Sequence, residues 1–204
     1  MSTSSLRIGV VGVGFGATVQ IPGFQSEGVE VIAVCSRRLH RVQKTALDFD
    51  IPYAFTDYAE MLKIDGLDAV SIVTAPALHH PMTIAALEAG KHVLCEKPFA
   101  LDRHQGMHML ETAQRSGLTA MITHEFRFAP QRTYVKSLLD QGYIGDLKIA
   151  HLSMFTSPQP GGLPRPTAWL LDESQGGGIL FALGSHYIDG LRHWFGEIVG
   201  VGGR

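Results

Sequence analysis

The chain has 204 residues, a formal net charge of −2 and 45% hydrophobic residues, a globular composition with room for one domain and part of another. Its near-neutral charge argues against nucleic-acid or membrane-surface binding, and it contains no run of about 18 apolar residues, the length that predicts a membrane span. Cys35 and Cys95 show no disulfide framework, so we expect free thiols in a reducing, cytoplasmic compartment.

Up to about residue 125, short apolar runs alternate with helical patterns. The first 16 residues predict a strand entering a turn rather than a signal peptide. Strands buried on both faces are predicted at residues 6–12, 29–35, 67–75, 91–96 and 118–123. Helices are predicted at about residues 16–26, 38–48, 57–63, 79–89, 102–116 and 129–140. Asp57 and Asp102 stand at N-cap positions, and Gly90 and Gly117 stand at helix ends. This alternation predicts an α/β fold, a doubly wound parallel sheet of the Rossmann type, over residues 1–125.

The pattern changes after about residue 145. Residues 147–156 alternate like a strand with one wetter face, and a Pro/Gly-rich loop follows at 157–166. A helix is predicted at about 178–195, and the last eight residues resemble the start of another strand. We interpret residues 126–204 as a connecting helix and the incomplete start of an α+β second domain.

A glycine-rich turn follows the first predicted strand and opens a helix. It reads Gly12-x-Gly14-Phe15-Gly16-Ala17. Gly12 permits the tight turn, Gly14 lets a diphosphate approach the backbone, and Ala17 lets the helix pack close to the strand. Free N–H groups at the helix start attract phosphate, so the turn predicts dinucleotide binding. A Gly-rich turn without a ligand is the alternative.

The second predicted strand ends at Ser36, Arg37 and Arg38. An NAD site usually has a carboxylate here for the ribose 2′-hydroxyl, whereas a hydroxyl and two guanidinium groups suit a 2′-phosphate. We therefore favour NADP as the cofactor, with NAD as the alternative. The other interpretation is that both arginines belong to the solvated start of the next helix.

The segment "TAPALHHPMTIAALEAGKHVLCEKPFA" (74–100) resembles the glucose–fructose oxidoreductase/inositol dehydrogenase (Gfo/Idh/MocA) family, whose "GKHV-x-x-EKP" pattern is intact. The glycine turn, "RFAPQRTYVKSLLDQGYIGDLKIAHL" and "WLLDESQGGGILFALGSHYIDGLRHWFGE" resemble further family blocks. The resemblance covers nearly the whole chain. It implies an NAD(P)-dependent oxidoreductase that transfers hydride between a nicotinamide and a sugar- or polyol-like hydroxyl or carbonyl group.

Two catalytic residues are implied by the resemblance. Lys97 matches the family's active-site lysine, and His186 matches its catalytic histidine. Their chemistry is coherent, because an imidazole can accept or donate the proton of the reacting oxygen and an ammonium can stabilise a developing alkoxide. Without the resemblance, a histidine among apolar helix residues is more often structural.

The resemblance also implies further cofactor contacts. Glu96 matches the acidic residue on the nicotinamide-side ribose, and Lys97 lies beside the nicotinamide. Thr74, Pro76 and His79 fall in the loop that contacts the cofactor after the fourth predicted strand of the family fold.

The chain departs from the family pattern before His186. The family usually has an Asp four residues earlier, where this chain has Ala182, and often an Arg at the position of Leu170. Asp189 is a candidate substitute for the missing carboxylate, although it matches a separate acidic position. Arg127 is equally well explained as a substrate contact or as a brace for its loop.

Two other functions stay open at this stage. A non-catalytic NAD(P)-binding regulatory or scaffold protein would explain Ala182, and an NAD-dependent glycosidase would share the fold and the cofactor. The histidines show no metal-ligand spacing, so we expect no metal. We expect a small-molecule partner, a carbohydrate or polyol, and association into a homo-oligomer or with a partner chain through the incomplete second-domain sheet.

Overall fold

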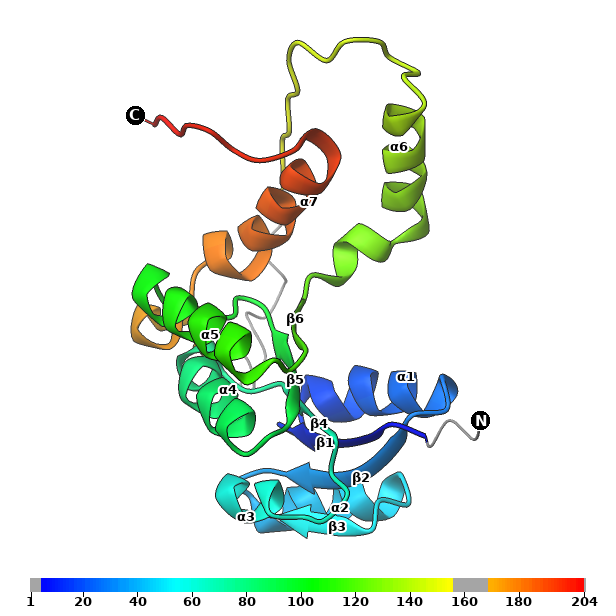
Figure 1. The fold of residues 1–204 in the computed structure, drawn as a ribbon, viewed down its shortest axis with the longest axis vertical. Helices are drawn as coiled ribbons and strands as arrows, with labels where there is room; N and C mark the ends of the chain where they lie inside the picture. Colours follow the sequence, from blue (N-terminus) through cyan, green and yellow to red (C-terminus); the bar gives the residue numbers. More distant parts are fainter. Residues whose placement is uncertain (1–4, 156–168, 204) are drawn as a thin grey trace.

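A six-stranded parallel sheet organises the first part of the chain (Figure 1). The computed structural model describes residues 5–155 and 169–203. The strands are β1 (Arg7–Val11), β2 (Glu30–Cys35), β3 (Tyr53–Phe55), β4 (Ala69–Ile72), β5 (His92–Glu96) and β6 (Ala120–Thr123). Their order is β3-β2-β1-β4-β5-β6, and every neighbouring pair is parallel. This is the doubly wound dinucleotide-binding order, which confirms the predicted α/β fold.

Helices connect the strands at nearly all the predicted places. They are a π-helical turn η1 (Gly16–Gln20) continuing as α1 (Ile21–Ser26), α2 (Leu39–Asp48), α3 (Tyr58–Leu62), η2 (Pro76–Leu78), α4 (His79–Glu88) and α5 (Arg103–Ser116). The Asp57 carboxylate accepts a hydrogen bond from Ala59 N and that of Asp102 accepts one from Gln105 N, so both predicted N-caps are present. Gly117 ends α5 at a φ of 67°.

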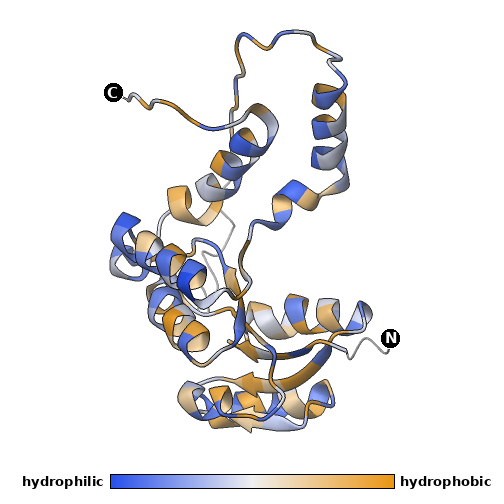
Figure 2. Ribbon diagram, in the orientation of Figure 1, coloured by the Kyte–Doolittle hydropathy of each residue, from blue (hydrophilic) through white to orange (hydrophobic). Residues whose placement is uncertain are grey.

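Apolar side chains fill both faces of the sheet. Ile8 and Val10 pack against Ile21 and Val42 on one face, whereas Val11 belongs to the cluster on the other face. Figure 2 shows the strands as the most hydrophobic part of the fold. Burial on both faces explains why β1, β2, β4 and β5 read as nearly continuous apolar runs. The same prediction is wrong for β6, an edge strand in which Met121 is 55% and Ile122 38% exposed. The fully buried apolar side chains among the described residues all lie before residue 110.

The rest of the chain extends away from the sheet (Figure 1). It contains η3 (Glu125–Phe128), α6 (Pro130–Asp140), η5 (Glu173–Gln175), a π-helical turn η6 (Leu180–Gly184) and α7 (Ser185–Phe195). The helix predicted at 178–195 is therefore present, with a π-helical first part. The Pro/Gly loop predicted at 157–166 lies outside the described residues.

The strand predicted at 147–156 is wrong over its described part. Residues 147–155 have no strand structure, nor do residues 196–203. A strand needs a hydrogen-bonded neighbour, and among the described residues none pairs with either segment. Ile149 and Phe155 are consequently 86% and 96% exposed. Over the described ranges, every helix is too short or too polar to span a bilayer.

Candidate functional site

The glycine turn at the end of β1 leaves its outer backbone open. At Gly12, φ is +107° and an added Cβ would lie 2.3 Å from the carbonyl oxygen of Val73, so only glycine fits. An added Cβ at Gly14 would meet no atom within 4 Å, whereas one at Gly16 would lie 3.0 Å from Val10. A side chain would thus be blocked at Gly12 and crowded at Gly16, whereas Gly14 faces open space.

The helix that follows presents its N-terminus to this open space. Phe15 precedes η1, is 49% exposed and makes no side-chain capping bond. The first N–H groups of a helix have no acceptor within it, and they carry a partial positive charge. Ala17 N and Thr18 N both donate to Gly14 O. An open glycine backbone at the N-terminus of a helix fits the diphosphate of a dinucleotide.

The end of β2 lies beside the glycine turn, because Val11 pairs with Cys35 across the two strands. Ser36 follows, and its Oγ accepts a hydrogen bond from Arg38 N at 3.4 Å. The side chains of Arg37 and Arg38 are exposed, and neither forms an ion pair with the described residues. Two exposed guanidinium groups therefore lie where the adenosine ribose of a bound dinucleotide would be placed.

The loop after β4 is fixed by a buried histidine. His79 is 1% exposed, with its Nδ1 2.8 Å from Pro98 O and its Nε2 3.0 Å from Thr74 O. Burial lowers the pKa of His79, although both carbonyls favour its protonated form. The ring thereby joins the loop of Thr74 and Pro76 to the segment that carries Lys97. His79 thus holds this loop in place, and its contact with a cofactor stays a prediction.

Glu96, at the end of β5, lies in a buried polar network. It is 7% exposed, and its Oε1 accepts a hydrogen bond from Gln20 Nε2 at 2.7 Å. Gln20 also accepts a hydrogen bond from the Ser71 hydroxyl, so the network connects η1, β4 and β5. Burial, and then the charge of Glu125, raise the pKa of Glu96. In this arrangement the carboxylate faces Gln20, a residue that no sequence motif indicated.

Lys97 and His186 come together although 88 residues separate them in the chain. Lys97 Nζ donates to Ala182 O at 3.2 Å, and Ala182 lies one turn before His186. His186 is 1% exposed and stacks on Phe126, with ring centroids 4.0 Å apart. Burial, then the charge of Lys97, lower the pKa of His186 to about 4, so its imidazole is neutral at pH 7.

Aromatic and charged groups of His124, η3, α6 and α7 surround His186. His124 contacts it edge-on, and Glu125 Oε1 lies 3.7 Å from its Nε2. The Arg132 guanidinium lies 4.9 Å from the Phe126 ring centroid and 5.1 Å from that of Tyr187. Buried His186 Nδ1 has no hydrogen-bond partner among the described residues.

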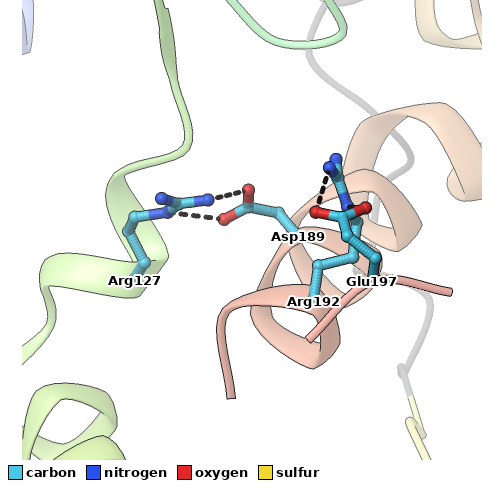
Figure 3. Close-up of polar contacts among 4 residues, drawn as sticks. All are labelled: Arg127, Asp189, Arg192 and Glu197. Carbon is cyan, nitrogen blue, oxygen red and sulfur yellow. Dashed lines mark hydrogen bonds and ion pairs between the residues drawn. The ribbon is translucent and has the colours of Figure 1, made fainter. Parts of the chain in front are cut away.

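Asp189, the candidate substitute for the carboxylate missing at Ala182, is bound to Arg127 (Figure 3). Arg127 Nε donates to Asp189 Oδ2 at 3.0 Å, and Arg127 Nη2 donates to Asp189 Oδ1. Burial alone would raise the pKa of Asp189, but the hydrogen bonds from Arg127 hold it below its ordinary value. Arg127 therefore braces η3 against α7, where Asp189 and His186 share the buried face.

The three glycines before η6 are required by close contacts and backbone shape. A Cβ at Gly176 would lie 2.7 Å from Pro76 and from Leu101, and a Cβ at Gly177 would lie 2.5 Å from Trp169 O. Gly178 has a φ of +106°. This segment thus packs against the loop after β4 and directs η6 toward Lys97.

Sequence reasoning missed Gln20, Glu125 and Arg132. Glu125 follows β6 almost directly, at the strand end where parallel sheets place ligand-contacting residues, and this position was the available signal. Gln20 and Arg132 lie in predicted helices and carry no motif. Within the described ranges, no three His, Cys, Asp or Glu side chains gather where a metal ion could bind.

Known proteins resemble the chain in sequence and fold. Residues 6–124 match the oxidoreductase family with an NAD-binding Rossmann fold, and residues 133–204 match the GFO/IDH/MocA C-terminal domain. The chain is 33% identical to mouse trans-1,2-dihydrobenzene-1,2-diol dehydrogenase over 94% of its length and 57% of that protein's. It is 29% identical to Escherichia coli D-glucoside 3-dehydrogenase, over 96% and 56% of the two chains.

Solved structures of known oxidoreductases also match the fold of this chain. A 3-ketoreductase from Actinomadura kijaniata, in complex with TDP-benzene and NADP, matches with a TM-score of 0.79 and 30% identity, over 95% of this chain and 58% of that one. Apo scyllo-inositol dehydrogenase from Lactobacillus casei matches with a TM-score of 0.80 and 25% identity, over 96% and 56%. The chain spans little more than half the length of these relatives. It belongs to the Gfo/Idh/MocA oxidoreductase family, whose fold binds NAD.

Proposed function

We propose that this chain takes part in NAD(P)-dependent oxidation or reduction of a sugar- or polyol-like substrate at a CH–OH or carbonyl carbon. The contact of Lys97 with Ala182 in η6, one turn before His186, is the observation that carries the proposal, together with the open glycine turn. The names of the relatives support the substrate class, because they include a glucoside dehydrogenase and an inositol dehydrogenase.

The proposed mechanism divides the work between two side chains. The nicotinamide, when bound, supplies or accepts the hydride. His186, neutral at pH 7, accepts the proton of the substrate hydroxyl during oxidation. The Lys97 ammonium, held by Ala182 O, stabilises negative charge on the same substrate oxygen. In reduction the imidazolium returns the proton to that oxygen.

The cofactor we propose is NADP, with Gly12 to Ala17 on the diphosphate and Ser36 to Arg38 on the 2′-phosphate. Free guanidinium groups at this position support NADP over NAD. Residues 1–125 would bind the dinucleotide and residues 126–204 would complete the substrate side. Two buried free thiols, Cys35 and Cys95, support a reducing compartment such as the cytoplasm. Association through residues 147–155 stays a prediction.

A panel of sugars and polyols, followed at the nicotinamide absorbance with NADP and NAD, tests the proposal. We expect turnover that falls by about 10²–10⁴-fold in His186→Ala, while dinucleotide binding is kept. Ala182 favours the second candidate, a non-catalytic dinucleotide-binding protein. Tight NADP binding without hydride transfer to any substrate would select that candidate, and absence of dinucleotide binding would refute both.

A further inference from the structure

We infer that Glu125 is the positioning residue of His186 and takes the place of the carboxylate that Ala182 lacks, an inference that rests on the proposed function. Ala182 has no acidic group, and Asp189 is engaged by Arg127. Glu125 Oε1 lies 3.7 Å from His186 Nε2, an ion-pair distance rather than a hydrogen bond.

The negative charge of the Glu125 carboxylate favours a proton on His186 Nε2. When Nε2 is unprotonated, two acceptor atoms face each other across 3.7 Å. Protonation at Nε2 turns this contact into an ion pair between imidazolium and carboxylate. Because His186 is 1% exposed, water screens this attraction poorly at the imidazole. Glu125 therefore stabilises the charge that His186 gains when it takes the substrate proton.

Other charged groups also act on His186. The side chains that face it from the surrounding elements are Lys97, His124, Arg132, Asp189 and Glu125. Lys97, His124 and Arg132 disfavour the imidazolium, and Asp189 favours it. Asp189 is shared between Arg127 and His186, and Glu125, 3.7 Å from Nε2, is a second carboxylate that can compensate the nearby cations.

The place of Glu125 in the fold also suits a residue that positions His186. Glu125 begins η3, which packs against α7. Its side chain is 45% exposed, while the ring of Phe126 lies flat on His186. The stacking fixes the plane of the imidazole, and the Glu125 carboxylate lies on the Nε2 side of the ring.

The experiment is an NMR titration of His186 in the chain without cofactor, together with turnover measurements. The variants are Glu125→Gln, which keeps the shape and removes the charge, and Glu125→Asp, which keeps the charge. Glu88→Gln is the matched control, because Glu88 is an exposed acid at the end of α4.

In Glu125→Gln we expect a lower pKa of His186 and a kcat reduced roughly tenfold, less than the loss for a proton-transfer group itself. The KM and the dissociation constant of NADP should stay unchanged. The acidic limb of the kcat profile for oxidation should move to lower pH, because the base stays neutral to lower pH. Glu125→Asp should retain part of the effect, and Glu88→Gln should match the wild type.

An unchanged His186 pKa and an unchanged kcat in Glu125→Gln would overturn the inference while leaving the proposed function intact. A lowered pKa in a chain that transfers no hydride would instead confirm the contact and refute the proposed function.

Discussion

Substituting Gly12 and Gly14 separately should distinguish folding from cofactor binding. In Gly12→Ala, the new Cβ would lie 2.3 Å from Val73 O and 2.8 Å from Val73 C, where ordinary contact begins at 3.4 Å. The backbone of Gly12 also has a φ of +107°, which L side chains rarely adopt. The obstacle is backbone of the adjoining strand end, so rotation of a side chain does not relieve it.

The loss of stability can be built from two parts. A strained backbone conformation costs about 1–3 kcal/mol, and forcing atoms into a packed site costs about 1–3 kcal/mol. Together they remove about 2–6 kcal/mol from a free energy of unfolding that is normally about 5–15 kcal/mol. A loss near the middle of this range lowers the melting temperature by roughly 8–16 °C for a chain of this size.

Gly14→Ala is the matched comparison. Its Cβ would meet no atom within 4 Å, so the free energy of unfolding should change by less than about 1 kcal/mol. NADP binding should weaken, because the methyl group occupies the face that the diphosphate approaches. Urea unfolding followed by circular dichroism measures the first quantity, and calorimetric titration measures the second. Wild-type stability in Gly12→Ala, or wild-type NADP affinity in Gly14→Ala, would refute this reasoning.

Three further outcomes are expected. Arg37→Ala should cost about 1.5–3 kcal/mol of NADP binding and leave NAD binding unchanged, as measured by calorimetry; equal affinity of the wild type for both dinucleotides would contradict this. Lys97→Met should reduce turnover and, because it removes a positive charge that lowers the pKa of His186, move the acidic limb of the oxidation profile to higher pH; a limb that stays in place would separate Lys97 from His186. Arg127→Ala should destabilise the fold by about 1–3 kcal/mol at pH 7, because Asp189 loses its partner. Since Asp189 has a lowered pKa, the contribution of this pair should be complete above the ordinary pKa of 3.8 and lost as pH falls through the lower folded value, which urea unfolding at several pH values measures.

The sheet could be predicted because the burial of its central strands is visible in their apolar composition. Residues such as Val10, Val34 and Val70 are fully buried, and such burial on both faces leaves an apolar run. β3 was missed because it has only three residues, and Tyr53 is 48% exposed. The 147–156 segment has strand-like alternation, but alternation does not supply a hydrogen-bonding neighbour.

The candidate site was predictable only where one short segment carries the information. Gly12 and Gly14 act through local backbone geometry, so their spacing was sufficient. The contacts of Glu96 with Gln20 and of His186 with Glu125 join distant segments, and they depend on how α7 and η1 approach the sheet. A π-helical turn in each of these places changes which side chains face inward, and the sequence gives no sign of it.

The contacts of Gly176 with Pro76 and of Ala182 with Lys97 have a consequence for how this chain tolerates changes of length. Each contact ties the returning segment to the end of a different neighbouring strand of one rigid sheet, so the distance between them is fixed. One residue inserted into the helical part of this stretch would rotate the residues after it by about 100° and advance them by about 1.5 Å, turning His186 away from Lys97. Beyond the three glycines, evolution can therefore exchange exposed side chains along this stretch, such as Leu180, more freely than it can add or delete a residue there.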